Sequence, residues 1–277
     1  MIPITNILSV CITLFITLIL PVVVYVIYGL KNKGKGVWIA WLLGAAGFFV
    51  FQIIIRTPIL SMLSLLPGFV EFELEHYILY CFILAFSAGL FEAAGRYAVA
   101  KILSKKLDYT QSFAAGLGHG SIESIFVVGL TYVSNIIYII MINSGSFDIF
   151  VEQTAAVGAD TTMLIGLKDS LINTNFIMFL LAAYERILVV ILHIALSMLV
   201  CYFVSQKKDF VGIFICILCH CTVDFIVPIV NGMATVYLGN IISLSTAYVI
   251  IYVFLTLVAV ASIITIRQIR KKWEFII

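Results

Sequence analysis

The hydrophobic and polar positions of this chain alternate in long blocks: extended apolar runs are separated by short polar connections. Runs of about 20 apolar residues are long enough to cross a membrane as helices, whereas membrane-spanning strands show about 10 alternating residues. Because lipid offers the backbone no hydrogen bonds, such runs are expected to be helical. The pattern predicts seven spans, at residues 4–30, 37–55, 77–100, 111–141, 174–205, 210–230 and 245–266.

Composition supports this interpretation and excludes a soluble globular protein. Hydrophobic residues make up 63% of the chain and charged residues 11%, whereas soluble domains carry roughly 25% charged residues. The apolar runs continue through all 277 residues. We therefore expect an all-α polytopic transmembrane bundle that forms a single integral membrane domain, residues 1–277.

The distribution of charge predicts the orientation of the bundle, because basic residues concentrate in cytoplasmic connections. One set of connections holds only Arg56 and Lys168 together with acidic residues. The opposite set holds Lys31, Lys33, Lys35, Lys101, Lys105, Lys106, Lys207, Lys208, Arg267, Arg270, Lys271 and Lys272. This asymmetry predicts an outside N-terminus and a cytoplasmic C-terminus. Segments 57–76 and 143–172 would lie on the outer side, as interfacial helices or a lid.

Several ionisable residues fall inside the predicted spans, where each ionised group costs about 2.5–3.5 kcal/mol on insertion scales. Such a cost indicates a functional polar interior rather than packing alone. The set comprises Glu92, Arg96, His119, Glu123, Glu185, Arg186, His193, His220 and Asp224.

The depths and spacings of these residues indicate that several of them meet. Glu92, His119, His193 and His220 lie roughly 12–18 Å below the predicted cytoplasmic boundary, at 1.5 Å per helical residue. Residues four apart share a helix face, which applies to Glu92 with Arg96, His119 with Glu123, and His220 with Asp224. The sequence around His119, residues 116–120, reads GLGHG and lets another helix approach closely.

Charge counting leaves three chemical alternatives for this interior. Its four carboxylates exceed its two arginines, and a dry site does not hold uncompensated charge. Some acids are then protonated, or histidines carry protons, or a cation is bound. In the metal alternative, His119, His193 and His220 would hold zinc and Glu92 would act as a base.

Two segments carry a resemblance to a known family. Residues 91–97, FEAAGRY, and 116–123, GLGHGSIE, resemble signatures of the YhfC family of intramembrane peptidases. Glu185-Arg186 with His193, and His220 with Asp224, match its later motifs in order and spacing. The family is related to PrsW-type and CAAX prenyl-protein proteases.

The resemblance implies a glutamate-dependent hydrolase that cleaves peptide bonds in the cytoplasmic half of a membrane, in bacteria the cytoplasmic membrane. It implies Glu92, His119, His220 and Asp224 as catalytic residues. The supporting residues would be Arg96, Glu123, Glu185, Arg186 and His193. We expect no cofactor, with zinc as the runner-up. Lipids and a peptide or membrane-protein substrate are the expected partners, and nucleic acid is not.

One position departs from the family pattern, and it keeps other functions open. The family has a second glutamate where this chain has Ala93, which would suit a catalytically weakened scaffold relative. A proton-coupled transporter is the other alternative, because chains of acidic and histidine side chains also form proton relays.

Overall fold

The computed structural model describes residues 1–274, apart from the side chain of Lys106, and these residues fold into helices and short connections. Among the described residues, seven helical stretches are long and apolar enough to cross a membrane, which confirms the predicted number. They are Ile4–Lys31, Val37–Leu63, Tyr77–Leu103, Tyr109–Ser144, Phe176–Ser205, Asp209–Gly232 and Leu244–Glu274.

Three of these stretches are built from α-helix interrupted by a π-helical segment. The first stretch joins α1 (Ile4–Leu14), η1 (Phe15–Ile19) and α2 (Leu20–Lys31). The second joins α3 (Val37–Phe48), η2 (Phe49–Arg56) and α4 (Thr57–Leu63). The fourth joins α7 (Tyr109–Glu123), η4 (Ser124–Gly129) and α8 (Leu130–Ser144). Single π turns inside helices occur often at functional sites. Here η4 begins directly after Glu123.

The other four stretches are uninterrupted α-helices, and short helices lie in the connections. The spanning helices are α6 (Tyr77–Leu103), α11 (Phe176–Ser205), α12 (Asp209–Gly232) and α13 (Leu244–Glu274). The connecting helices are α5 (Phe69–Glu75), η3 (Ser104–Lys106), α9 (Ser146–Ala156), α10 (Thr162–Asn173) and η5 (Val236–Leu238).

The chain divides into two compact units. The smaller consists of Met1–Val24 and Ser124–Ile187, and the larger of Tyr25–Glu123 and the chain from Leu188 onward. In the smaller unit α1 packs against α8, and α9 and α10 pack against α8 as well. The Asn6 amide donates to the carbonyl oxygens of Leu171 and Thr174, both at 3.0 Å, and so ties α1 to the end of α10. The prediction of a single domain stays a prediction.

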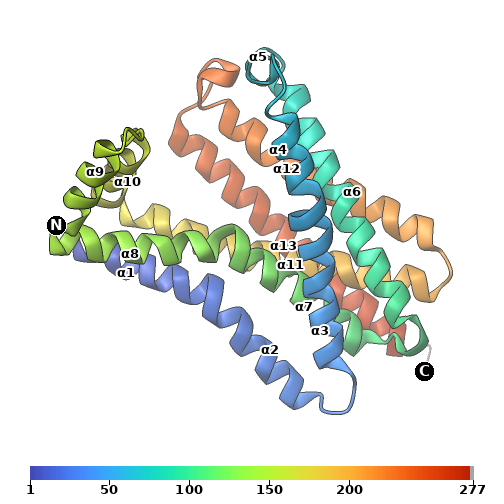
Figure 1. Cartoon of the computed structure of the whole chain (residues 1–277). Coiled ribbons are helices and arrows are strands. Elements are labelled where there is room, and N and C mark those ends of the chain that lie inside the picture. The colour runs from blue at the N-terminus through green and yellow to red at the C-terminus, as the bar shows by residue number, and fades with distance from the viewer. Residues whose placement is uncertain (275–277) are drawn as a thin grey trace. The chain divides into compact units, whose positions relative to one another are not determined.

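The larger unit places its central helices side by side (Figure 1). Within it α3 packs against both α7 and α6, and α12 packs along α6. Small residues allow these contacts: a Cβ atom added at Gly44 of α3 would overlap the Ala115 carbonyl of α7. Many large apolar side chains on the outer faces of the helices are exposed, as a lipid-facing surface requires.

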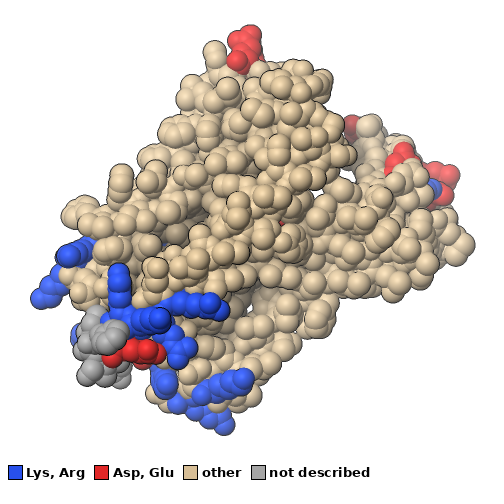
Figure 2. Space-filling model, turned by 180° about the vertical axis from the view of Figure 1, so that it is seen from behind, with Lys and Arg blue, Asp and Glu red and all other residues tan. Residues whose placement is uncertain are grey.

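Basic residues of the larger unit gather at one end of it, where Figure 2 shows most of the lysine and arginine side chains. Lys101, near the end of α6, forms an ion pair of 2.5 Å with Asp209 at the start of α12. The Arg270 guanidinium of α13 lies 5.3 Å from the ring centre of Tyr109 in α7. The basic connections therefore share one end, and the assignment of that end to the cytoplasm stays a prediction.

One residue assigned to an outer connection lies inside a helix instead. Arg56 ends η2, and the second span continues beyond it as α4 to Leu63. Its guanidinium donates to the Leu84 carbonyl at 2.8 Å and to the Ser87 hydroxyl at 3.0 Å, both on α6. Pro58 follows in the first turn of α4 and removes one backbone donor from this continuous helix.

Candidate functional site

Glu92 lies in the middle of α6 and is 2% exposed. One of its oxygens, Oε2, is surrounded by nitrogen atoms. His119 Nε2 of α7 lies 3.0 Å away and His220 Nε2 of α12 lies 2.8 Å away. Arg96 Nη2, one turn along α6, lies at 3.1 Å, and His193 Nδ1 of α11 at 3.7 Å. Four helices of the larger unit therefore meet at one buried carboxylate oxygen.

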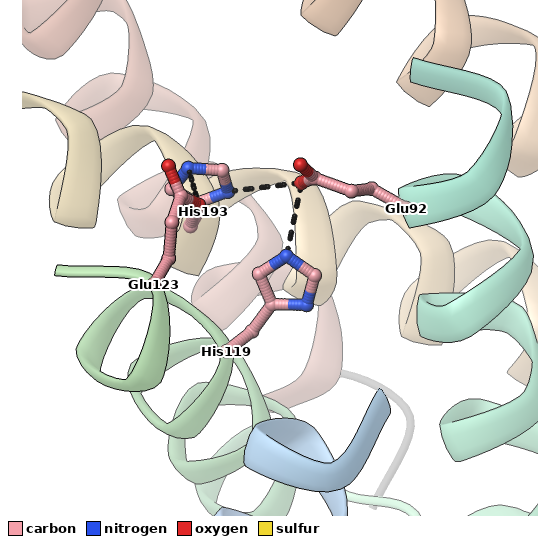
Figure 3. A group of neighbouring side chains, drawn as sticks. All are labelled: Glu92, His119, Glu123 and His193. Carbon is pink, nitrogen blue, oxygen red and sulfur yellow. Dashed lines mark hydrogen bonds and ion pairs between the residues drawn. The ribbon is translucent and has the colours of Figure 1, made fainter. Parts of the chain in front are cut away.

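Arg96, His193 and Glu123 form a row of close polar contacts beside this centre (Figure 3 shows its His193–Glu123 end). Arg96 Nη2 lies 2.5 Å from His193 Nδ1. Because a guanidinium stays protonated in proteins and only donates, His193 Nδ1 must accept. A neutral His193 then carries its proton on Nε2, which lies 2.6 Å from Glu123 Oε2.

His220 has a comparable carboxylate behind it. Its Nδ1 lies 3.2 Å from Asp224 Oδ2, one turn further along α12. His220 is almost fully buried, whereas the Asp224 side chain is 38% exposed. A carboxylate on one ring nitrogen fixes the ring and leaves the other nitrogen free to accept or to bind a metal. Glu123 and Asp224 thus hold His193 and His220 in the same way, each with the opposite ring nitrogen turned toward Glu92.

Glycines bring α7 close enough for these contacts. Gly116 and Gly120 face α11: an added Cβ would lie 2.7 Å from Ile194 Cα at the first position and 3.2 Å from Val190 Cα at the second. Gly118 faces α3, where an added Cβ would overlap the Trp41 carbonyl oxygen. His119 stands between the two contacts, so the GLGHG segment packs His119 against both neighbouring helices.

The structure brings together seven of the nine residues that the sequence singled out: Glu92, Arg96, His119, Glu123, His193, His220 and Asp224. The other two, Glu185 and Arg186, belong to the smaller unit and form an ion pair of 2.5 Å with each other. Ala93, where the family pattern has a second acid, is fully buried in the apolar core.

Sequence reasoning missed Arg56 as part of this region. Its guanidinium interacts electrostatically with Glu92 and Asp224. The signal was the segment after Arg56, residues 58–66, which contains no charge, and the helix continues through its first six residues to Leu63. A charge inside a continuous apolar run belongs to the interior rather than to a loop.

The donor set fits a divalent transition metal. Imidazole nitrogens and carboxylate oxygens are the usual ligands of catalytic zinc. Glu92, His119, Glu123 and His193 each offer one ligand atom within 4.8 Å of the others. The cluster also holds more carboxylates than guanidiniums. Its carboxylates are Glu92, Glu123 and Asp224, and its guanidiniums are Arg96 and Arg56. With neutral histidines the cluster carries negative charge, which a cation would compensate.

Comparisons with known proteins agree with this description. A family model described as "YhfC intramembrane metalloprotease" matches residues 16–255. The chain is 28% identical over 228 residues to "Uncharacterized membrane protein YhfC" of Bacillus subtilis (strain 168), which covers 82% of this chain and 84% of that protein. No solved structure matches. With the seven apolar helices, these similarities identify an integral membrane protein of the bacterial cytoplasmic membrane.

Proposed function

This chain belongs to the YhfC intramembrane metalloprotease family, and from that premise we propose that the cluster around Glu92 is the reaction centre of a peptidase. The observation that carries the proposal is the convergence of His119, His193 and His220 on Glu92 Oε2. Apolar packing alone gives no reason to bury three imidazoles around one carboxylate, because each buried polar group costs free energy unless it is paired.

We assign metal binding to His119 through Nε2, His193 through Nδ1 and His220 through Nε2. These are the nitrogens nearest Glu92 Oε2. Glu123 Oε2 lies 2.6 Å from the far nitrogen of His193, and Asp224 Oδ2 lies 3.2 Å from that of His220. Carboxylates take this position behind metal-binding histidines. Arg96 donates to His193 Nδ1 and therefore competes with a metal for that lone pair. A bound zinc ion would supply Lewis acidity toward the scissile carbonyl.

Glu92 acts as the general base in this proposal. Peptide hydrolysis needs a group that takes a proton from the attacking water and a group that returns one to the leaving amine. A buried carboxylate can serve in both steps. Arg96 Nη2 donates to Glu92 Oε2 at 3.1 Å and holds the carboxylate in place.

The metal-free alternative uses the same residues. Glu92 and His119 would hold the water, and His220, held by Asp224, would donate a hydrogen bond to the developing oxyanion. The expectation of a site without a cofactor rested on this mechanism. The family description and the donor set favour the metal-dependent version.

The position of Glu92 suggests where cleavage takes place. Glu92 precedes Leu103, the last residue of α6, by eleven residues, or about 16 Å of helix. Leu103 lies at the basic end, for which the charge distribution predicts the cytoplasm. We propose cleavage of peptide or membrane-protein substrates in the cytoplasmic half of the membrane.

The test is cleavage of a fluorogenic membrane-spanning peptide in proteoliposomes. We expect Glu92→Ala, His119→Ala and His220→Ala each to abolish turnover, while Glu71→Ala, on the exposed part of α5, keeps it. Matched expression and thermal unfolding profiles separate a catalytic loss from misfolding. Unchanged turnover in all three site variants would refute the proposal.

A further inference from the structure

A small cavity lies behind the Glu92 cluster, between α3, α6, α7 and α11. Its volume is about 10 Å³, close to the smallest space that holds one water molecule. Gly44, Val99, Ala115 and Cys201 line it together with Arg96, His119 and Ser197. It therefore contains both apolar walls and polar groups.

Two nitrogen atoms of Arg96, which lines this cavity, donate no hydrogen bond to any described residue. Arg96 uses Nη2 for Glu92 and His193, but Nε and Nη1 have no hydrogen-bond partner among the described residues. Arg96 is 3% exposed. A buried guanidinium with unpaired N–H groups is costly, and it lies directly at the cavity wall.

Ser197 supplies the matching acceptor. Buried or half-buried hydroxyls on helices commonly bond to the carbonyl four residues earlier, as Ser262 does to Val258 at 2.8 Å. Ser197 is 3% exposed. Its hydroxyl makes no such bond and has no hydrogen-bond partner among the described residues. It lines the same cavity as Arg96.

We propose that this cavity is a binding site for one water molecule, which accepts a hydrogen bond from Arg96 Nε or Nη1 and donates one to Ser197 Oγ. A buried water typically makes about two to four hydrogen bonds, and these two partners reach the lower end of that range. The water satisfies a guanidinium N–H that no described residue accepts. Arg96 is thereby held with Nη2 on both Glu92 and His193, and Ser197 is a positioning residue.

The direct test is a structure of the wild-type protein at a resolution that shows ordered waters. The proposal predicts one peak within about 2.7–3.2 Å of Ser197 Oγ and of Arg96 Nε or Nη1. A dry cavity, or a Ser197 hydroxyl bonded to the His193 carbonyl, would overturn it. This test does not depend on peptidase activity, so its failure is distinct from failure of the proposed function.

A second test uses stability. In Ser197→Val the methyl groups take the place of the water and leave the Arg96 donors unpaired, whereas Ser262→Val removes a hydroxyl that its own helix satisfies. We expect the Tm of Ser197→Val in detergent to lie roughly 3–10 °C below that of Ser262→Val. Equal Tm values, or a more stable Ser197→Val, would contradict the proposal.

Discussion

Glu92 Oε2 lies 2.8 Å from His220 Nε2, on the side of the imidazole opposite to Asp224. The contact joins α6 to α12, which pack along each other through Gly89: a Cβ there would lie 3.0 Å from the Ile217 carbonyl. The close approach of two helices thus places a base and an imidazole at hydrogen-bonding distance in a buried site.

Asp224→Asn should weaken the site without destroying it. An asparagine keeps the size of the side chain but removes the charge that holds His220 Nδ1–H. Losses of outer hydrogen-bond partners cost about 10–100-fold in metal affinity or activity. Titration of zinc into the metal-free variant, together with peptide turnover, measures both quantities. Zinc affinity and peptide turnover equal to those of the wild type would show that Asp224 has no role at His220.

Removal of the metal should abolish peptide cleavage reversibly. Chelation followed by buffer exchange is expected to stop turnover, and zinc is expected to restore it, because the metal supplies the Lewis acidity of the site. Elemental analysis before and after chelation gives the matching metal content. Full turnover by protein proven free of metal would instead support the glutamate-and-histidine mechanism.

Two variants distinguish the alternative ligand sets. If His119, His193 and His220 hold the metal, His220→Asn should lose it, and Glu123→Gln should retain it with affinity lowered about 10–100-fold. If Glu92, His119, Glu123 and His193 hold it, the order reverses. Metal content of the two purified variants, measured at the same free zinc concentration, decides between the sets.

Gly118→Ala should destabilise the larger unit. The added methyl group would overlap the Trp41 carbonyl and lie 3.1 Å from the Ala45 nitrogen, so α3 and α7 must separate. Overpacking of this kind costs typically about 1–3 kcal/mol. Gly166→Ala is the control, since no atom lies within 4 Å of its added Cβ. Thermal unfolding should rank Gly118→Ala below both wild type and the control, and an unchanged Tm would be inconsistent with the helix contact.

The sequence predicted the number of spans and the side chains that share a helix face, because both follow from one-dimensional patterns, whereas the depth of the site stays a prediction. Apolar run length determines a span, and residue spacing determines which side chains share a helix face. Glu92 lies in contact with Arg96, and His220 with Asp224, as their spacing predicts. The close approach of helices at GLGHG was also predicted from its small residues.

Contacts between different helices could not be predicted in the same way. His193 bonds to Arg96 of α6 and Glu123 of α7, and no spacing within α11 indicates either partner. The charge of Arg56 indicates the end of an apolar run, so the sequence predicts Arg56 in a connection. In the structure the helix continues through Arg56 from η2 into α4. Whether a charged residue in an apolar run lies in a connection or inside the helix bundle depends on contacts between helices. A hydropathy profile gives no information about those contacts.

The most direct test of the central claim is Glu92→Gln. Glutamine has nearly the same shape and retains an oxygen for His119 and His220, but it cannot act as a general base. We expect the purified variant to keep its zinc and its Tm in proteoliposomes while peptide cleavage falls by at least about 100-fold. Cleavage at the wild-type rate, with the substitution verified and zinc bound, would contradict it.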